Sequence, residues 1–189
     1  EPYRRQRQMC IRDRDSVTVL EQNGIKIAVL NYTYGLNGIA LPSDMPYAVN
    51  LLDEEKVKAD IASAKEQSDF VVVCPHWGTE YSLQPDSMEK KWTKIFAESG
   101  ADLVLGTHPH VIEPIERVED ETTGHQMLVY YSLGNFGNWT SSSGDGIANR
   151  MVGGMAEITV GLDEAGRGFI VDYLSLIHIS EPTRRTPIS

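Results

Sequence analysis

Residues 71–111 read VVVCPHWGTEYSLQPDSMEKKWTKIFAESGADLVLGTHPHV, and this stretch decides the fold of the chain. The apolar run from Phe70 to Cys74 is short and rich in β-branched residues, which predicts a buried strand. Pro75 is expected to end that strand, because proline has no N–H to donate to a neighbouring strand. Leu103 to Leu105 predicts a second buried strand further along the chain.

A helix is predicted between these two strands, because apolar residues recur there at helical spacing. Asp86 or Ser87 is available as its N-cap, and Gly100 as its C-terminal stop. Strand, helix and strand within about thirty residues form a βαβ unit, whose crossover is right-handed and whose strands are parallel. The residues expected to face the sheet are Met88, Trp92, Ile95 and Phe96.

Three of the five histidines lie in the loops that follow these strands. His76 follows the first strand, and His108 and His110 follow the second, so the three rings are expected to meet at the edge where open α/β sheets keep their sites. If the backbone around Pro109 is extended, the side chains of His108 and His110 point the same way and can face one metal ion. Gly106 is expected to leave room beside them. The alternative is that each histidine is an ordinary packed or hydrogen-bonded residue.

The rest of the chain reads as more strands and one more helix. Asn23-Gly24 between two apolar runs is a strong hairpin signal, and Asp53 can cap a helix from Glu54 to about Gln67. After His110, four strand-like runs joined by turn-like connections predict an antiparallel meander. These runs are Val111 to Val118, Gln126 to Ser132, Met155 to Gly161 and Gly168 to Leu174.

Burial can also be predicted in this second half. The acid-rich stretch from Glu113 to Glu121 is expected to form a solvated strand edge. In the sequence YSLGNF, Tyr130, Leu133 and Phe136 are expected in the core, whereas Asn135 can face the site.

The chain has 189 residues and a net charge of −10, which suits one domain with a sizeable core. Five arginines fall in residues 1–15 and two in residues 178–189, so the body between them is strongly acidic and does not suit nucleic acid. The basic ends would suit nucleic-acid or membrane tails, but both resemble translated sequencing adapters. Residues 16–175 are therefore taken as the domain, with 1–15 and 176–189 as foreign segments. No signal peptide and no membrane-spanning apolar run is visible in the sequence.

Four motifs in order resemble the bacterial capsule synthesis family CapA, which is tied to poly-γ-glutamate biosynthesis. They are HWGTEY, Gln84-Pro85, SGADLVLGTHPHV and YSLGNF, within a match from Val17 to Tyr173. The family is similar to calcineurin-like metallophosphoesterases. The resemblance implies an α/β protein, the C-terminal portion of a layered metallophosphoesterase fold with mixed sheets flanked by helices.

The resemblance also implies a role in the biosynthesis of capsule or another cell-surface polymer. The parent protein would be a metal-dependent hydrolase of phosphoesterase type, at the cell surface, with the polymer or its synthesis machinery as partner. The alternative is a non-catalytic binding or export component of a capsule-assembly complex.

The metal site follows from the same resemblance. His76 matches the isolated metal-binding histidine of the family, and His108 and His110 match its Gly-x-His-x-His ligands. Manganese, iron or zinc suits such ligands. The wider superfamily also uses earlier carboxylates and an Asn-His that do not precede Val17 here. The dinuclear centre is therefore expected only in the full-length parent, and this chain is expected to bind metal weakly and to lack phosphoesterase activity.

Four further residues are expected to support the histidines or to contact substrate: Glu80, Tyr81, Trp77 and Asn135. Metal-binding histidines usually donate their other ring N–H to a carboxylate or carbonyl oxygen, a role open to Glu80 or Asn135. The alternatives are a solvated acid for Glu80 and a packed aromatic ring for Tyr81. Trp77 fits a core residue that anchors its loop better than a platform for stacking.

Overall fold

The computed structural model describes residues 17–41, 43, 45, 48–137 and 145–179. The segments expected to be foreign, 1–15 and 176–189, lie outside the described residues except for 176–179. The described elements, in chain order, are β1 (Thr18–Gln22), β2 (Ile25–Thr33), α2 (Glu54–Gln67), β3 (Phe70–His76), α3 (Ser87–Ser99), β4 (Leu103–Leu105), β5 (Ile115–Glu119), β6 (Gln126–Tyr130), α4 (Ile147–Arg150), β7 (Val152–Leu162) and β8 (Gly168–Ile179).

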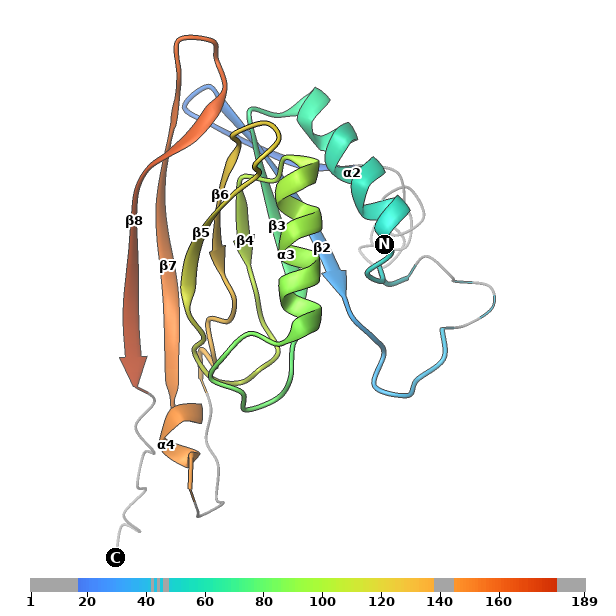
Figure 1. The fold of residues 1–189 in the computed structure, drawn as a ribbon, viewed down its shortest axis with the longest axis vertical. Coiled ribbons are helices and arrows are strands. Elements are labelled where there is room, and N and C mark those ends of the chain that lie inside the picture. Colours follow the sequence, from blue (N-terminus) through green and yellow to red (C-terminus); the bar gives the residue numbers. More distant parts are fainter. Residues whose placement is uncertain (1–16, 42, 44, 46–47, 138–144, 180–189) are drawn as a thin grey trace, which may run out of the picture.

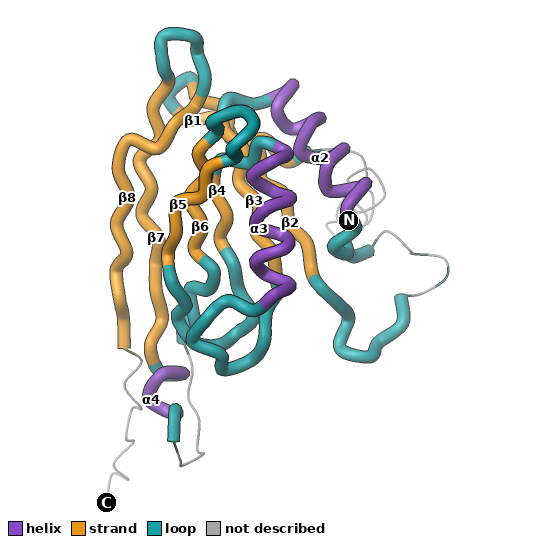
Figure 2. The backbone as a smooth tube through the Cα atoms, in the orientation of Figure 1, coloured by secondary structure: helices purple, strands orange, loops and turns teal. Residues whose placement is uncertain are grey.

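The fold has three layers: α2 and α3 cover one face of a six-stranded sheet, and the β7–β8 hairpin covers the other (Figure 1). The strand order is β1-β2-β3-β4-β6-β5, in which β2, β3, β4 and β6 are parallel and the two edge strands are antiparallel. The predicted βαβ unit is confirmed, with β3 and β4 as parallel neighbours. The loops that follow β2, β3 and β4 therefore lie at the same end of the sheet (Figure 2).

Both long helices begin and end where the sequence predicts. The side chain of Asp53 accepts the Lys56 N–H at the start of α2. Asp86 caps α3 in a full capping box, in which the Glu89 carboxylate accepts the Asp86 N–H at 2.7 Å. Gly100 ends α3 in the left-handed conformation that glycine adopts without strain.

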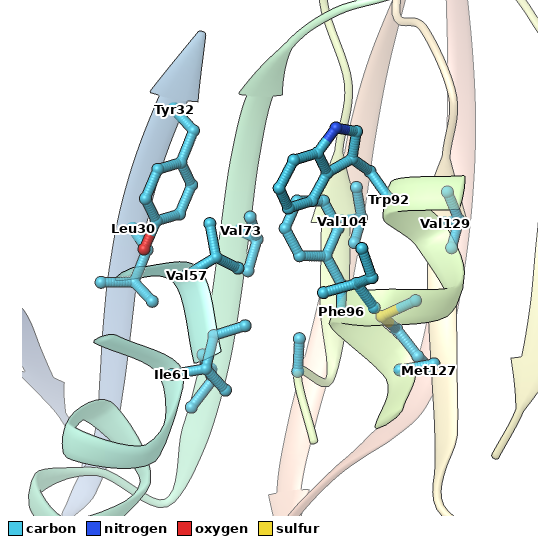
Figure 3. Packing of buried hydrophobic residues seen from close by; sticks show 14 of the residues in the cluster. Leu30, Tyr32, Val57, Ile61, Val73, Trp92, Phe96, Val104, Met127 and Val129 are labelled. Atoms are coloured by element: carbon cyan, nitrogen blue, oxygen red, sulfur yellow. The ribbon is translucent and has the colours of Figure 1, made fainter. Parts of the chain in front are cut away.

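The side chains of β3 alternate between the two faces of the sheet. Val71 and Val73 pack in the cluster formed with the helices, whereas Phe70 and Val72 pack in the cluster formed with the hairpin. Burying an aliphatic or aromatic side chain of this size contributes about 1.5–3 kcal/mol each. The helix-facing cluster in Figure 3 includes Leu30, Tyr32, Val57, Ile61, Val73, Trp92, Phe96, Val104, Met127 and Val129.

Strand β3 continues through Pro75 to His76, so the prediction that Pro75 ends it is wrong. Proline lacks only a donor, and the Pro75 carbonyl still accepts the Thr107 N–H at 3.0 Å. On the other side of the strand, Pro75 lies opposite Tyr32 in the parallel ladder. The strand can therefore carry His76 on its last residue rather than in the loop.

The predicted antiparallel meander is confirmed only in two pairings, β5 with β6 and β7 with β8, and is wrong as a single run of four strands. Strand β6 lies between β4 and β5 and runs parallel to β4, while β7 and β8 form a separate sheet. From Met127 to Tyr130, β6 is buried on both faces, which is the environment of a central strand. The predicted strand from Val111 begins only at Ile115.

Two predictions of burial fail in opposite directions. Phe136, expected in the core, is 78% exposed, whereas Glu113, expected at a solvated edge, is 3% exposed. In the described part of the chain, no helix is long and apolar enough to cross a membrane.

Candidate metal centre

Main-chain hydrogen bonds join the two histidine loops. The Trp77 N–H donates to the Thr107 carbonyl at 3.0 Å, and the Tyr81 N–H donates to the Pro109 carbonyl at 2.7 Å. On the other side, the Tyr34 N–H donates to the His76 carbonyl at 2.9 Å. The loops that follow β2, β3 and β4 are thus held together before any side chain of the site is considered.

The three imidazole rings converge, as the βαβ unit predicts. The ring centroids of His76 and His108 lie 4.6 Å apart, and those of His108 and His110 lie 6.0 Å apart. The expected extended backbone is wrong, because the φ angles of His108 and His110 are +110° and +62°. In a strand, residues two apart point to the same face because successive side chains alternate between the faces. His108 and His110 instead lie on the same side because the loop turns at each of them.

Three side chains place metal-binding atoms close together. One ligand atom each from Glu80, His108 and His110 lies within 4.8 Å of the others, in a cluster that we call the histidine corner. His76 lies beside this cluster, next to the ring of His108. Imidazole nitrogens with one carboxylate form a donor set that zinc, iron and manganese accept.

The hydrogen bonds around two histidines leave the same ring nitrogen available. Asn135 donates its amide N–H groups to the carbonyls of His110 (3.0 Å) and Arg150 (3.1 Å), so its oxygen is the acceptor for His110 Nδ1–H at 2.8 Å. The Thr107 hydroxyl donates to the Pro75 carbonyl at 3.4 Å, so it accepts from Nδ1–H of His76 at 3.3 Å. In both rings Nε2 then carries the free lone pair that a metal needs.

Electrostatics favour the neutral rings. Partial desolvation lowers the pKa of His76 below its ordinary value, although the side chain is exposed, and the neighbouring His108 and His110 lower it further. Burial also lowers the pKa of His108, and His110 adds to this shift, although the carboxylate of Glu80 opposes it. Neutral imidazole is the form that binds metal, so these rings are prepared for an ion near pH 7.

Two of the other predicted site residues lie at the corner. Asn135 contacts His110 as described, and the Tyr81 ring stacks on the His110 ring with centroids 6.0 Å apart. The guanidinium carbon of Arg150 lies 4.2 Å from the centroid of the Tyr81 ring. Arg150, on α4, has no signal in the sequence that separates it from an ordinary surface arginine.

Trp77 and Gly106 belong to the core beneath the corner. The Trp77 side chain is fully buried, and its indole N–H donates to the Tyr131 carbonyl at 2.9 Å. A Cβ at Gly106 would lie 1.9 Å from that same carbonyl oxygen, so Gly106 leaves no room for a ligand, contrary to expectation. The glycine is needed because the Tyr131 main chain passes directly over it.

Tyr34 is a site residue that the sequence did not single out. Its ring centroid lies 4.9 Å from that of His108 and 6.3 Å from that of His76. The available signal was its position one residue after β2, a third parallel strand whose C-terminal end lies at the same edge.

A large cavity lies at the other end of β3. It has a volume of about 810 Å³ and is lined by Phe70, Asp102, His125, Arg167 and other residues. Its charges are mixed, and several are already engaged: Arg167 pairs with Asp163, and Asp102 accepts the Val71 N–H. Among the described residues, the group of side chains that could hold a metal ion is at the histidine corner and not in this cavity.

The fold has three layers and carries its histidines at the C-terminal ends of the parallel strands β3 and β4. It is an α/β fold of the metallophosphoesterase type. It superposes with a TM-score of 0.51 on the 5'-nucleotidase precursor from Thermus thermophilus, over 87% of this chain and 29% of that one. The sequence identity is 16%, so this likeness shows the fold alone. The fold class predicted from the sequence is thereby confirmed.

The model of the family described as bacterial capsule synthesis protein PGA_cap matches residues 10–138, and the chain belongs to this family. It is 36% identical over 124 residues to the PGA biosynthesis protein CapA of Bacillus subtilis (strain 168), across 65% of this chain and 31% of that protein. It is 29% identical over 130 residues to the capsule biosynthesis protein CapA of Bacillus anthracis, across 66% and 30%. The chain therefore spans less than a third of each of these curated relatives.

Proposed function

We propose that this chain forms the histidine-bearing part of a divalent-metal site in a protein of capsule or poly-γ-glutamate biosynthesis. The relatives supply the biological process, since both carry capsule or PGA biosynthesis in their names. The observation that carries the metal is the set of ligand atoms from Glu80, His108 and His110, all within 4.8 Å of one another. The whole protein acts as a metal-dependent hydrolase of phosphoesterase type at the cell surface, with the polymer or its synthesis machinery as partner and no nucleic acid.

The residues present fit a divalent ion of the zinc, manganese or iron kind. His108 and His110 supply imidazoles and Glu80 a carboxylate, while His76 can join from beside His108. Asn135 fixes the His110 ring, and Thr107 fixes the His76 ring, each through Nδ1. These contacts hold the two rings in place, so binding requires little loss of side-chain freedom.

When bound, a divalent ion polarises a phosphoryl oxygen and lowers the pKa of a coordinated water. Within this chain, the histidines and Glu80 would hold the ion, and the Tyr81 ring lies between His110 and the Arg150 guanidinium. Three imidazoles and one carboxylate are too few to complete two coordination shells. We therefore expect a dinuclear site only with carboxylates from the rest of a full-length protein, and this chain alone binds metal weakly and does not turn over phosphodiesters.

The test uses a full-length protein that contains this sequence, purified with and without the substitution His108→Ala. The expected result is manganese-dependent hydrolysis of a generic phosphodiester that His108→Ala abolishes, with the fold unchanged by circular dichroism. Polymer binding that needs no metal, together with no hydrolysis, would contradict the enzyme and favour a binding or export component. Robust hydrolysis by the 189-residue chain alone would contradict the incomplete site.

A further inference from the structure

Two glutamates are buried beneath the histidine corner. Glu89 lies in the first turn of α3 and is fully buried, and Glu113 lies three residues after His110 and is 3% exposed. Acidic side chains are almost never buried to this extent unless they are paired. The sequence predicts neither position, since both read as ordinary surface acids.

The oxygens of these carboxyl groups have few donors. Glu89 Oε2 accepts the Asp86 N–H at 2.7 Å. The other Glu89 oxygen and both Glu113 oxygens receive no N–H or O–H from another group among the described residues. The two side chains lie within hydrogen-bonding reach of one another. A direct hydrogen bond between two carboxyl groups requires that one of them carries a proton.

The charges around the pair also favour protonation. Asp86 faces both groups and is acidic, and the neighbouring Tyr131 and Thr93 hydroxyls bring no positive charge. Burial, followed by the hydrogen bond and the negative charge of Glu89, raises the pKa of Glu113 to about 9. Burial likewise raises the pKa of Glu89. At neutral pH the pair then holds one shared proton and not two full charges.

The pair connects the two histidine loops from below. A Cβ at Gly78, two residues after His76, would lie 2.7 Å from the Glu89 carboxyl carbon, so the first loop rests directly on this group. The Thr79 hydroxyl donates to Asp86, the N-cap residue that Glu89 also holds. Glu113 belongs to the second loop, where its N–H donates to the Ser132 carbonyl at 3.2 Å.

We propose that Glu89 and Glu113 share one proton and act as a positioning pair that fastens the loop of His76 to the loop of His108 and His110. The pair is in place whether or not a metal is bound. Its role in preforming an ion site rests on the proposed function. Neither glutamate contacts the ion; each acts through the loops.

The first experiment measures the proton. Carbon NMR of the whole chain with labelled glutamate carboxyls, assigned with Glu113→Gln, follows each side chain from pH 3 to pH 10. The expected result is that one carboxyl of the pair stays protonated at pH 7. If every glutamate is ionised at pH 7, or if the pair ionises and holds a bound cation instead, the shared proton is refuted.

The second experiment compares three variants through the ring-proton signals of His76 and His108 in metal-free buffer. Glu113→Gln keeps a donor for Glu89 and is expected to leave these signals in place, whereas Glu113→Ala is expected to shift them. The exposed Glu121→Gln is the matched control and is expected to change nothing. Unmoved signals in Glu113→Ala, or equal shifts in Gln and Ala variants, would overturn the positioning role.

If Glu113→Ala does not fold, the pH dependence of the free energy of unfolding still tests the proposed pair. Because the pKa of Glu113 is about 9 in the folded chain and 4.5 ordinarily, the folded chain binds this proton more tightly than the unfolded chain does. The resulting stabilisation is fully present below pH 4.5 and is lost as the pH rises through 9. Glu113→Gln is expected to flatten this alkaline loss of stability, and an unchanged pH profile would contradict the pair.

A separate titration with Zn²⁺ alone tests the purpose of the pair. Glu113→Ala is expected to weaken binding about tenfold, and Glu113→Gln is expected to bind as the unsubstituted chain does. If the histidine signals shift in Glu113→Ala but no form of the chain binds Zn²⁺, the proposed metal function fails while the positioning pair stands.

Discussion

The Oδ1 atom of Asn135 lies 2.8 Å from Nδ1 of His110, and the amide group of the same asparagine donates to two main-chain carbonyls. This arrangement fixes both the tautomer and the orientation of the ring. Asn135→Ala is therefore expected to weaken Zn²⁺ or Mn²⁺ binding by about 10- to 100-fold, measured by isothermal titration calorimetry. The exposed Asn149→Ala is the control, and equal losses in both variants would contradict the specific role of Asn135.

His108 lies at the centre of the site, with the rings of His76, His110 and Tyr34 all within 6.0 Å by centroid. We expect His108→Ala to abolish the binding of divalent metal to the chain. The matched control is His125→Ala, because that ring lies at the other end of the sheet and contacts the Ala101 carbonyl at 2.7 Å. Equilibrium dialysis with metal analysis measures both, and retained binding in His108→Ala would exclude the histidine corner as the site.

The lowered pKa values of His76 and His108 make a prediction for the metal-free chain. A histidine whose folded pKa is depressed binds fewer protons folded than unfolded, so stability is present above the ordinary value of 6.5 and falls as pH drops below it. Proton NMR of the two rings is expected to give midpoints below 6.5, and urea unfolding is expected to show weaker stability at acid pH. A midpoint above 6.5 for either ring would contradict the partial desolvation of these rings beside the neighbouring histidines.

Gly106 has no space for a side chain, because a Cβ would lie 1.9 Å from the Tyr131 carbonyl oxygen and 2.5 Å from Nε1 of Trp77. Gly106→Ala is expected to cost about 3 kcal/mol or more of the free energy of unfolding, since neither neighbour can move without breaking their hydrogen bond. Gly35→Ala is the control, because nothing lies within 4 Å of its added Cβ. Chemical denaturation compares the two, and similar stabilities would refute the close packing.

The local features of the fold could be predicted from the sequence. The N-caps Asp53 and Asp86, the stop at Gly100 and the Asn23-Gly24 hairpin are chosen by contacts within a few residues, which a sequence pattern contains. The meeting of the histidine loops could also be predicted, because parallel neighbours share an edge.

The predictions that failed concern features that depend on residues far away in the chain. Strand β6 lies next to β4, where both of its faces are buried. No pattern within Gln126–Tyr130 predicts which strand it pairs with. Glu113 is buried because α3 brings Glu89 against it, and Tyr34 joins the corner because β2 pairs with β3. Long-range partners of this kind are set by packing and are absent from local periodicity.

The positive φ angles of His108 and His110 have a consequence for the order of events in assembly. Holding a residue other than glycine in this region costs about 1–3 kcal/mol each, and here the surrounding packing and hydrogen bonds supply it. The chain therefore reaches this conformation on folding, and the two imidazole rings are oriented before any ion binds. Binding of an ion therefore requires no rearrangement of the backbone at these two residues.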